Sequence, residues 1–455
     1  MRIVIIGAGE VGRHLARSLQ NEAELILVDA SAKVLAEAEE GLDALTLVGD
    51  GTHRSTLSRA EVHRAALVVA VTPDDAVNLV AAALAKRMGA KETVARVDDP
   101  AFYETELALE RGALGIDVVL CASRLVGVEL LRRLAEVRAR QVIPCAAGVV
   151  HVASHVLGED SPLVSRGRSR AASWPEPVRA VVRAGQLRSV AEVEHAELGD
   201  VVLIAGPPLT LLEVLHDMTP AEGSVKTTIV GGGDVGVQLA RLLGPRGLLD
   251  RLIELDRSRC WALAEQLDKV QILHGDGTNL AFLREEQVGR ADALLAVTGS
   301  DEANLMTSLL AREIGVDQVF ALVHRPGYAG VYSHLGVSGT VSPHETISQV
   351  IHWLRQALGA VIVGHWPLAG IAVEVVELRP GEEGVKIADL PLPPGTIPLQ
   401  IAGSELRAPK PRAVLHADDH LIVAVPSGRV PMLEKAMRKR GRGSSGAGSG
   451  SGGSG

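Results

Sequence analysis

Short apolar runs alternate with amphipathic segments along the first quarter of the chain. Apolar residues recur with helical spacing over 10–20, 32–40 and 75–88, and the runs around them predict strands at 2–6, 25–28, 45–48, 66–71 and 93–97. A wholly apolar run such as Ala66–Val71 is typical of a strand buried on both faces of a parallel sheet. Strands that alternate with helices indicate βαβ units. The predicted fold class is therefore α/β, with a Rossmann-like, doubly wound parallel sheet.

The second half of the chain repeats the first. Three motifs recur in the same order and at nearly one spacing: Ile3–Gly12 returns as Thr227–Gly236, Gly49–Thr52 as Gly275–Thr278, and Val69–Leu79 as Leu295–Leu305. Such self-similarity is the sequence signature of a duplication. We therefore expect two tandem Rossmann-like lobes.

A long helical stretch and then a smaller segment of strands and turns follow each lobe. The two smaller segments also resemble each other, at 182–185 and 400–403 and again at 199–204 and 418–423. We expect a first Rossmann-like lobe at 1–123, a crossover helix at 124–140, a small α+β lobe at 141–222, a second Rossmann-like lobe at 225–344, a crossover helix at 345–358, a second small α+β lobe at 359–437 and a flexible Gly/Ser tail at 441–455.

Composition narrows the function classes. The net charge is −9 and aromatic residues make up only 2% of the chain, which disfavours nucleic-acid binding. The three cysteines lie far apart, as expected in a reducing cytosol. We expect no transmembrane helix, because no run of about 18 apolar residues occurs, and no secretory signal, because Met1–Gly7 reads as a strand that enters a glycine turn.

The first glycine loop carries the features of a dinucleotide site. Gly7 permits the tight turn, Gly9 lets the backbone approach a pyrophosphate, and Gly12 allows close packing of strand and helix. The N–H groups of the following helix face the phosphates. Asp29 ends the second strand, where a carboxylate accepts the hydroxyls of an unphosphorylated ribose. The other expected contacts of this loop are Ala8, Glu10 and Val11.

The second loop repeats this pattern less completely. Its expected contacts are Gly231, Gly233, Asp234, Val235 and Gly236, with Glu254 as the acid and Asp256 as the alternative. Arg96 ends the fifth strand of the first lobe, whereas Leu322 occupies the matching position. A cation is thus expected in the first site and missing from that position of the second, where His324 and Arg325 are nearby substitutes.

Other candidates follow the third and fourth strands. Asp50 and Asp276 could contact the base or ribose, or each could cap the next helix. Val71, Thr72 and Thr298 lie at the carboxyl edge of the sheet, where backbone could touch the second ribose. Carboxylates at Glu10 and Asp234 would repel further negative charge, which favours NAD or a diphosphate over a triphosphate, unless both side chains point to solvent.

No catalytic or metal-binding motif accompanies these loops. The histidines show no metal-ligand spacing, and no GxSxG elbow is present. We therefore predict a protein that is not an enzyme, with no catalytic residue and no metal. The alternative is an NAD-dependent oxidoreductase, which would need an acid or base beside the nicotinamide. A soluble adenine-nucleotide sensor with another membrane partner is a third possibility.

Several further segments resemble one known family, the Trk-type potassium uptake regulators (TrkA), which contain tandem RCK (also called KTN) units. The segments that carry the resemblance, over about residues 1–437, are Ala95–Val97, Ser300–Gly315, Ala321–Arg325 with Tyr328, Val341–Pro343, Ile387–Leu390, Leu392–Ile397 and His416–Asp419. The first small lobe, with its insert Arg166–Arg170, and the loop Ser404–Pro411 depart from the family pattern.

The resemblance implies properties that the residue patterns alone do not. The small lobes become RCK C-terminal lobes, and Arg96 matches the family's nucleotide-contacting arginine. The cofactor becomes NAD(H), with ATP and ADP as further candidates. Four chains would form a homotetrameric ring of eight RCK units. That ring would lie in the cytoplasm, on the inner face of the plasma membrane beneath a potassium-translocating subunit, and bound nucleotide would control potassium flux.

Overall fold

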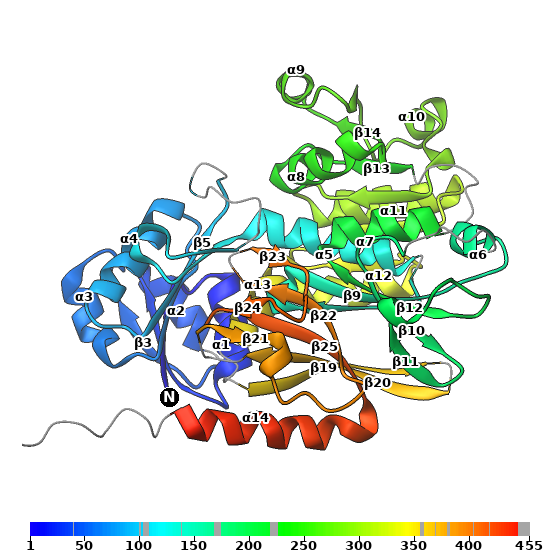
Figure 1. Ribbon diagram of the computed structural model, residues 1–455. Coiled ribbons are helices and arrows are strands. Elements are labelled where there is room, and N and C mark those ends of the chain that lie inside the picture. Colours follow the sequence, from blue (N-terminus) through cyan, green and yellow to red (C-terminus); the bar gives the residue numbers. More distant parts are fainter. Residues whose placement is uncertain are drawn as a thin grey trace, which may run out of the picture. The chain divides into compact units, whose positions relative to one another are not determined.

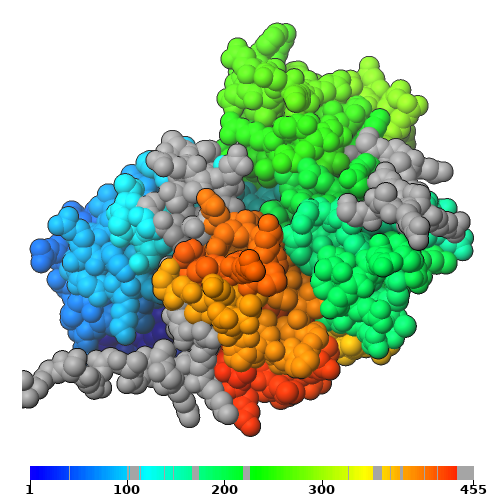
Figure 2. Space-filling model, viewed as in Figure 1, coloured from blue at the N-terminus to red at the C-terminus, as the bar shows by residue number. Residues whose placement is uncertain are grey.

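The chain divides into two compact units, one of Met1–Leu130 with Val225–His352 and one of Leu131–Ser224 with Trp353–Gly455. The computed structural model describes residues 1–39, 41–99, 102, 109–137, 139–167, 174–218, 226–354, 359–368, 370–379, 383–403, 405–417 and 419–444. Each unit combines a segment of the first half with a segment of the second (Figures 1 and 2). The first unit holds both Rossmann-like lobes, and the second holds both small lobes.

The first lobe is a seven-stranded sheet in the order β3-β2-β1-β4-β5-β7-β6. All neighbouring strands run parallel except β6 and β7. Its elements are β1 (Arg2–Ile6), α1 (Glu10–Leu19), β2 (Glu24–Asp29), α2 (Ala32–Glu39), β3 (Leu45–Val48), α3 (Arg54–Arg59), β4 (Leu67–Ala70), α4 (Asp75–Arg87), β5 (Glu92–Val97), β6 (Leu109–Arg111) and β7 (Val118–Cys121). The strand order reverses between β1 and β4, which is where such sheets bind ligands.

The second lobe is a wholly parallel six-stranded sheet in the order β15-β14-β13-β16-β17-β18. Its elements are β13 (Thr227–Val230), α8 (Asp234–Leu243), β14 (Leu249–Glu254), α9 (Arg257–Gln266), β15 (Gln271–His274), α10 (Leu280–Glu285), β16 (Ala293–Ala296), α11 (Asp301–Glu313), β17 (Gln318–Leu322), α12 (Ala329–His334) and β18 (Gly339–Val341). The duplicated α/β class predicted from the sequence is confirmed.

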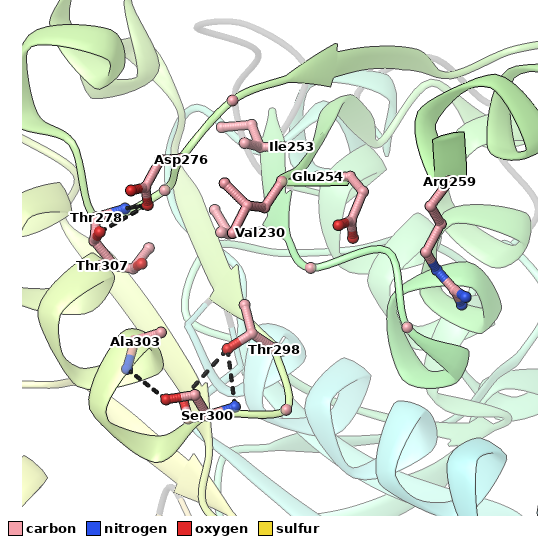
Figure 3. A pocket seen from close by; sticks show the side chains of 16 residues that line it. Val230, Ile253, Glu254, Arg259, Asp276, Thr278, Thr298, Ser300, Ala303 and Thr307 are labelled. Atoms are coloured by element: carbon pink, nitrogen blue, oxygen red, sulfur yellow. Dashed lines mark hydrogen bonds between the residues drawn. The ribbon is translucent and has the colours of Figure 1, made fainter. Parts of the chain in front are cut away.

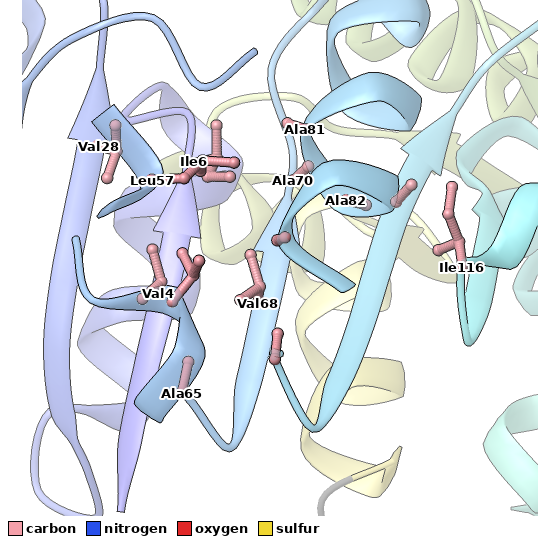
Figure 4. Close-up of a cluster of buried hydrophobic side chains, with 14 of the residues drawn as sticks. Val4, Ile6, Val28, Leu57, Ala65, Val68, Ala70, Ala81, Ala82 and Ile116 are labelled. Atoms are coloured by element: carbon pink, nitrogen blue, oxygen red, sulfur yellow. The ribbon is translucent and has the colours of Figure 1, made fainter. Parts of the chain in front are cut away.

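The cores of both lobes consist of the apolar runs seen in the sequence. In the first lobe, Val4, Val68 and Ala70 on the central strands pack against Ala81 and Ala82 of α4 (Figure 4). Each of these five side chains is fully buried. At roughly 1.5–3 kcal/mol for each large apolar side chain, burial of this kind holds the strand ends, and so the glycine loop, in a fixed frame.

The second unit contains two antiparallel sheets that share one apolar core. The sheet orders are β11-β10-β12-β9-β8 and β19-β20-β25-β22-β23, beside a small β21-β24 ladder. Val152 and Leu203 of the first sheet lie in the same cluster as Trp366 and Val375 of the second. The elements are β8 (Gln141–Cys145), β9 (Val150–Val156), α6 (Pro162–Gly167), β10 (Val178–Arg183), β11 (Gln186–Ser189), β12 (Val201–Gly206), α7 (Pro208–Met218), β19 (Gly359–Leu368), β20 (Ile371–Arg379), β21 (Val385–Lys386), β22 (Ile397–Ala402), β23 (Leu406–Arg407), β24 (Val414–Leu415), β25 (His420–Pro426) and α14 (Val430–Ser444).

The crossover helices and the tail differ in detail from the sequence expectations. Helix α5 spans Ala122–Glu136 and α13 spans Pro343–Leu354, so each begins two residues earlier than expected. Helix α14 continues through Ser444, into the Gly/Ser segment that we expected to begin a flexible tail at 441. Residues 168–170 of the arginine-rich insert, residues 355–358 and residues 445–455 lie outside the described residues.

Candidate nucleotide sites

Each loop has three glycines of the dinucleotide fingerprint, and the protein's own backbone requires the first and the last of them. Gly7 has a φ of +106°, and a Cβ there would lie 2.9 Å from the Thr72 nitrogen. A Cβ on Gly12 would lie 1.9 Å from the Gly7 carbonyl oxygen. Gly231 and Gly236 repeat both constraints, with a φ of +111° and a distance of 2.0 Å. Only glycine fits at these four positions, which join the first strand, the first helix and the fourth strand.

The middle glycine of each loop is different, because nothing in the described part of the chain requires it. Gly9 precedes α1 with a φ of −66°, and Gly233 precedes α8 with a φ of −67°, values that any residue adopts. A Cβ at either position would meet no heavy atom of the described residues within 4 Å. The open space therefore lies at the helix N-terminus, the part of a helix whose N–H groups donate hydrogen bonds to phosphates in nucleotide-binding proteins.

In each lobe, two backbone N–H groups at equivalent positions hold a carboxylate against the glycine loop. Asp29 accepts hydrogen bonds from the N–H groups of Ala8 and Ser31, both at 2.8 Å. Glu254 accepts them from Gly232 at 2.7 Å and from Asp256 at 2.8 Å. The choice of Glu254 as the acid is consistent with this geometry, since Asp256 instead caps α9 through the N–H of Arg259.

The longer acid of the second lobe is matched by a smaller neighbour. Gly232 stands where the first lobe has Ala8, and a Cβ on Gly232 would lie 2.9 Å from the Glu254 Oε2 atom. It would also lie 2.5 Å from a methyl group of Leu263. A carboxylate therefore reaches the same point of both loops. The first lobe combines Ala8 with the shorter Asp29, and the second combines Gly232 with the longer Glu254.

A cavity of about 460 Å³ lies over the carboxyl edge of the second sheet. This volume falls in the range typical of small-molecule sites. Five of the predicted residues line it, namely Gly231, Gly233, Glu254, Asp276 and Thr298, whereas Asp234, Val235 and Gly236 are not among its lining residues. Figure 3 shows Glu254 and Arg259 on one side of the cavity and Asp276, Thr298 and Ser300 on the other.

Asp50 and Asp276 do not cap the following helices, which corrects one of the two sequence expectations. Asp50 Oδ1 accepts hydrogen bonds from the N–H and hydroxyl of Thr52, and these bonds hold the pKa of Asp50 below its ordinary value. Asp276 makes the same pair of bonds to Thr278. Helix α10 is instead capped by Asn279. Both carboxylates therefore shape the Gly-Asp-Gly-Thr turn, and Asp276 also lines the cavity of the second lobe.

An asparagine that sequence reasoning did not select organises the other side of each site. Asn78 Oδ1 accepts from both the N–H and the hydroxyl of Thr72, while its Nδ2 donates to the carbonyls of Thr72 and Arg96. Asn304 makes the corresponding four bonds to Thr298 and Leu322. The signal was present in the repeated motifs VAVTPDDAVNL and LAVTGSDEANL. The polar backbone groups of Thr72 and Thr298 are thus already engaged by protein.

The loops that follow β5 and β17 carry different charged groups. In the first lobe, Arg96 lies 2.5 Å from Asp98, and the Arg96 Nε is buried with no hydrogen-bond partner among the described residues. Burial, only partly offset by Arg96, raises the pKa of Asp98. In the second lobe Leu322 replaces the arginine, and the His324 ring lies 2.9 Å from Asp301. The guanidinium of Arg325 contacts Glu302 and Tyr328 at the surface.

The acidic residue that follows the middle glycine of each loop, Glu10 or Asp234, also lies near a basic side chain. Glu10 is 55% exposed, and its carboxylate lies 2.9 Å from the ring of His344 at the start of α13. Burial lowers the pKa of His344, an effect that Glu10 opposes and Arg96 reinforces. Asp234 is 72% exposed and lies 4.0 Å from Arg259. Val11 and Val71 have buried side chains, so only their backbone could face a ligand.

A metal-binding cluster and a membrane-spanning helix are both absent from the described part of the chain. Among the described residues, no group of three or more His, Cys, Asp and Glu side chains is arranged to hold a metal ion. Within the same residues, none of the helices combines the length and apolar character that crossing a bilayer requires. The residues that converge at each loop are donors and acceptors suited to a ribose and to phosphates.

Comparison with known proteins identifies relatives of the whole chain. Residues 3–122 and 227–343 each match the family model of the TrkA-N domain. A Trk system potassium uptake protein TrkA homolog of Archaeoglobus fulgidus is 31% identical over 451 residues, covering 96% of this chain and all of the relative. The Trk system potassium uptake protein TrkA of Azorhizobium caulinodans is 30% identical, with 96% of this chain and 99% of the relative covered.

Solved structures show the same fold. The RCK domain of GsuK matches with a TM-score of 0.54 at 18% identity, covering 96% of this chain and 95% of that one. The GsuK channel bound to NAD matches with a TM-score of 0.54 at 20% identity, covering 96% of this chain and 79% of that one. At these identities the likeness concerns the fold alone, which is that of tandem RCK units.

Proposed function

Because the chain belongs to the TrkA family of Trk system potassium uptake proteins, we propose that it is the nucleotide-binding regulatory subunit of such a system. In this proposal four chains form a ring of eight RCK units on the cytoplasmic face of the membrane. The ring docks on a potassium-translocating subunit and controls its flux. NAD(H) is the proposed ligand, with ATP and ADP as competitors.

The observation that carries nucleotide binding is the middle glycine of each loop. Gly9 and Gly233 have ordinary backbone angles and open space where a side chain would lie. The described part of the folded chain therefore gives no reason for glycine at either position. A pyrophosphate lying against the helix N-terminus does, because a Cβ would occupy the space that its oxygens need.

The carboxylates favour an unphosphorylated ribose. Asp29 and Glu254 are each fixed by two backbone donors, which leaves their remaining lone pairs for ribose hydroxyls. A phosphate on the 2′ oxygen would lie beside that negative charge and be repelled. The GsuK channel, which shares this fold, was solved with NAD bound, and this supports NAD(H) as the first ligand to test here.

Regulation follows if the nucleotide binds one ring shape better than another. A ligand shifts such an equilibrium only by its difference in affinity for the two states. Coupling free energies of about 1–3 kcal/mol are typical, which corresponds to roughly 5–150-fold in affinity. The contact between Glu10 of the first loop and His344 at the start of α13 is a direct route from a bound phosphate to a crossover helix.

The proposal is tested by calorimetric titration of NAD, NADH, ATP and ADP into the wild type and into the Asp29→Ala and Glu254→Ala variants. Each substitution should remove one binding event and leave the other. Potassium flux into vesicles that hold the translocating subunit should then respond to nucleotide with the wild type and lose part of that response with each variant. Unchanged affinities in Asp29→Ala would show that the first site is wrong.

The rival function, an NAD-dependent oxidoreductase, makes a different prediction. Incubation with NADH and candidate carbonyl substrates should show binding but no loss of absorbance at the nicotinamide band. Steady NADH consumption that depends on Asp29 or Glu254 would replace the regulatory proposal with the enzymatic one.

A further inference from the structure

Each Rossmann-like lobe has an arginine near the carboxyl edge of its sheet, but the two arginines lie on opposite sides of the switch point. A doubly wound sheet binds a dinucleotide across its switch point, with the adenosine half over the first three strands and the other nucleotide over the next strands. Arg96 stands at the end of β5, on the far side of the switch point from Asp29. Arg259 stands on α9, on the same side of the switch point as Glu254.

Arg259 belongs to the cavity of the second lobe, and the first lobe has a valine at the matching position. The Arg259 Nε donates to the Gly232 carbonyl at 2.6 Å, which holds the guanidinium beside the glycine loop. Arg259 lines the cavity (Figure 3), as Leu255 also does. The hydrogen bonds after each acid establish the correspondence. Arg259 N–H donates to Asp256, as Val34 N–H donates to Ser31.

Among the described residues, the other half of the second site offers no free cation. The described residues that line the cavity include none from β17 or from the loop that follows it. Leu322, at the position of Arg96, is buried. His324 lies against Asp301, and Arg325 pairs with Glu302 and stacks on Tyr328 at 5.3 Å. The far half of this site therefore presents little that a second nucleotide could bind.

From this arrangement we propose that the second site takes an adenine mononucleotide such as ADP, whereas the first site takes a dinucleotide. The inference rests on the proposed nucleotide binding and deepens it. At the second site, Glu254 binds the ribose, Leu255 covers the base, and the Arg259 guanidinium contacts the base face or the phosphates, both of which attract a planar cation. A second ribose or a nicotinamide gains little over Leu322. At the first site, Arg96 adds a cation to the far half; one of its terminal nitrogens pairs with Asp98, while its buried Nε has no hydrogen-bond partner among the described residues.

The test is calorimetry on full-length variants that keep one site each. In Asp29→Ala, which keeps the second site, ADP should bind at least as tightly as NAD. Adding Arg259→Val introduces the residue found at the matching position of the first lobe. This change should weaken ADP binding by about tenfold, the size of one lost charge-assisted contact. Arg257→Val is the matched control, since Arg257 is an exposed arginine of the same helix and does not line the cavity. It should change ADP affinity by less than about twofold.

In Glu254→Ala, which keeps the first site, NAD should bind at least about tenfold more tightly than ADP, and Arg96→Leu should remove that preference. Any of three outcomes would overturn the inference. The second site could prefer NAD over ADP, it could bind 2′,5′-ADP more tightly than ADP, or Arg259→Val and Arg257→Val could have equal effects. These outcomes leave nucleotide binding intact. Absence of any binding to the wild type would instead overturn the proposed function.

Discussion

The two Rossmann-like lobes share the residues that fix the backbone of the glycine loop but differ in the charged side chains around it. Gly7 and Gly12 match Gly231 and Gly236, and Asn78 matches Asn304 bond for bond. The acids, the arginines and the loops after β5 and β17 differ. After duplication, therefore, the groups that close the loop stayed fixed, while the groups proposed to contact a ligand diverged. Architecture and specificity can be tested separately by matched substitutions in the two lobes.

The largest effect is expected from closing the space between strand and helix. Gly12→Ala and Gly236→Ala each place a Cβ within 2.0 Å of a carbonyl oxygen that cannot move without breaking the turn. Each should destabilise its own lobe by about 3 kcal/mol, at the upper end of overpacking costs. Hydrogen–deuterium exchange of peptides from β1 and β13 would measure this for each lobe. A loss in only one lobe would contradict the view that the two turns are equivalent.

The next effect concerns the buried asparagines. Asn78→Leu and Asn304→Leu each remove four hydrogen bonds, so that one threonine N–H and two carbonyls lose their asparagine partner. We expect a loss of about 2 kcal/mol in each lobe, because unsatisfied buried groups are costly. Urea unfolding monitored by exchange in α4 and α11 would compare the two.

The matched controls for this comparison lie on the same two helices. Val80 of α4 and Met306 of α11 have exposed side chains, so Val80→Asn and Met306→Asn change helix composition without touching the buried hydrogen bonds. Each control should change the unfolding free energy by less than about 0.5 kcal/mol, as surface substitutions do. If Asn78→Leu and Asn304→Leu are no less stable than these controls, the buried hydrogen bonds contribute little to stability.

A smaller effect distinguishes the lobes. Gly232→Ala copies Ala8 of the first lobe but brings a Cβ against Glu254 and Leu263, both of which are side chains that can shift. The expected loss is about 1 kcal/mol. Adding Glu254→Asp, which completes the first-lobe pair, should recover part of it, and a double-mutant cycle measures the coupling. Strictly additive free energies would show that the glycine and the longer acid are not matched to each other.

The smallest expected effect is the pH dependence of the contact between Glu10 and His344. Burial lowers the pKa of His344 in the folded protein below its ordinary value of 6.5. The unfolded chain then binds more protons below that pH, so the stability present above pH 6.5 is lost as pH falls. Between about pH 7.5 and 5.5, the wild type should lose up to about 1 kcal/mol more than His344→Gln. If the stabilities of the two proteins depend equally on pH, the protonation of His344 does not contribute to the pH dependence.

Local sequence patterns predict the parts of the site that depend on order along the chain. Repeated glycines, the acid at the end of the second strand and the alternation of strands and helices all follow from such patterns. The ends of the predicted helices and strands agree with the structure to within two residues in the first lobe. Contacts between distant segments do not follow. Asn78 reaches the end of β5, and His344 reaches a loop of the other lobe.

Two other differences have local physical reasons. Asp50 and Asp276 are candidate helix caps because they precede helices, but each folds back on the threonine two residues later. Nothing in the sequence distinguishes Arg259 from a surface residue of its helix, and its position over the cavity depends on a bond to the Gly232 carbonyl. Side-chain direction, more than element position, limits what the sequence predicts about this site.

The most direct test of the central claim uses the two glycines that the fold does not need. Gly9→Ala and Gly233→Ala should leave the unfolding free energy within about 1 kcal/mol of the wild type, the scale of a helix-cap change, because no described protein atom lies near the added Cβ. Each should nevertheless abolish nucleotide binding at its own site in calorimetric titration and leave the other site unchanged. If both variants are folded and bind every nucleotide as the wild type does, the glycine loops are not nucleotide sites.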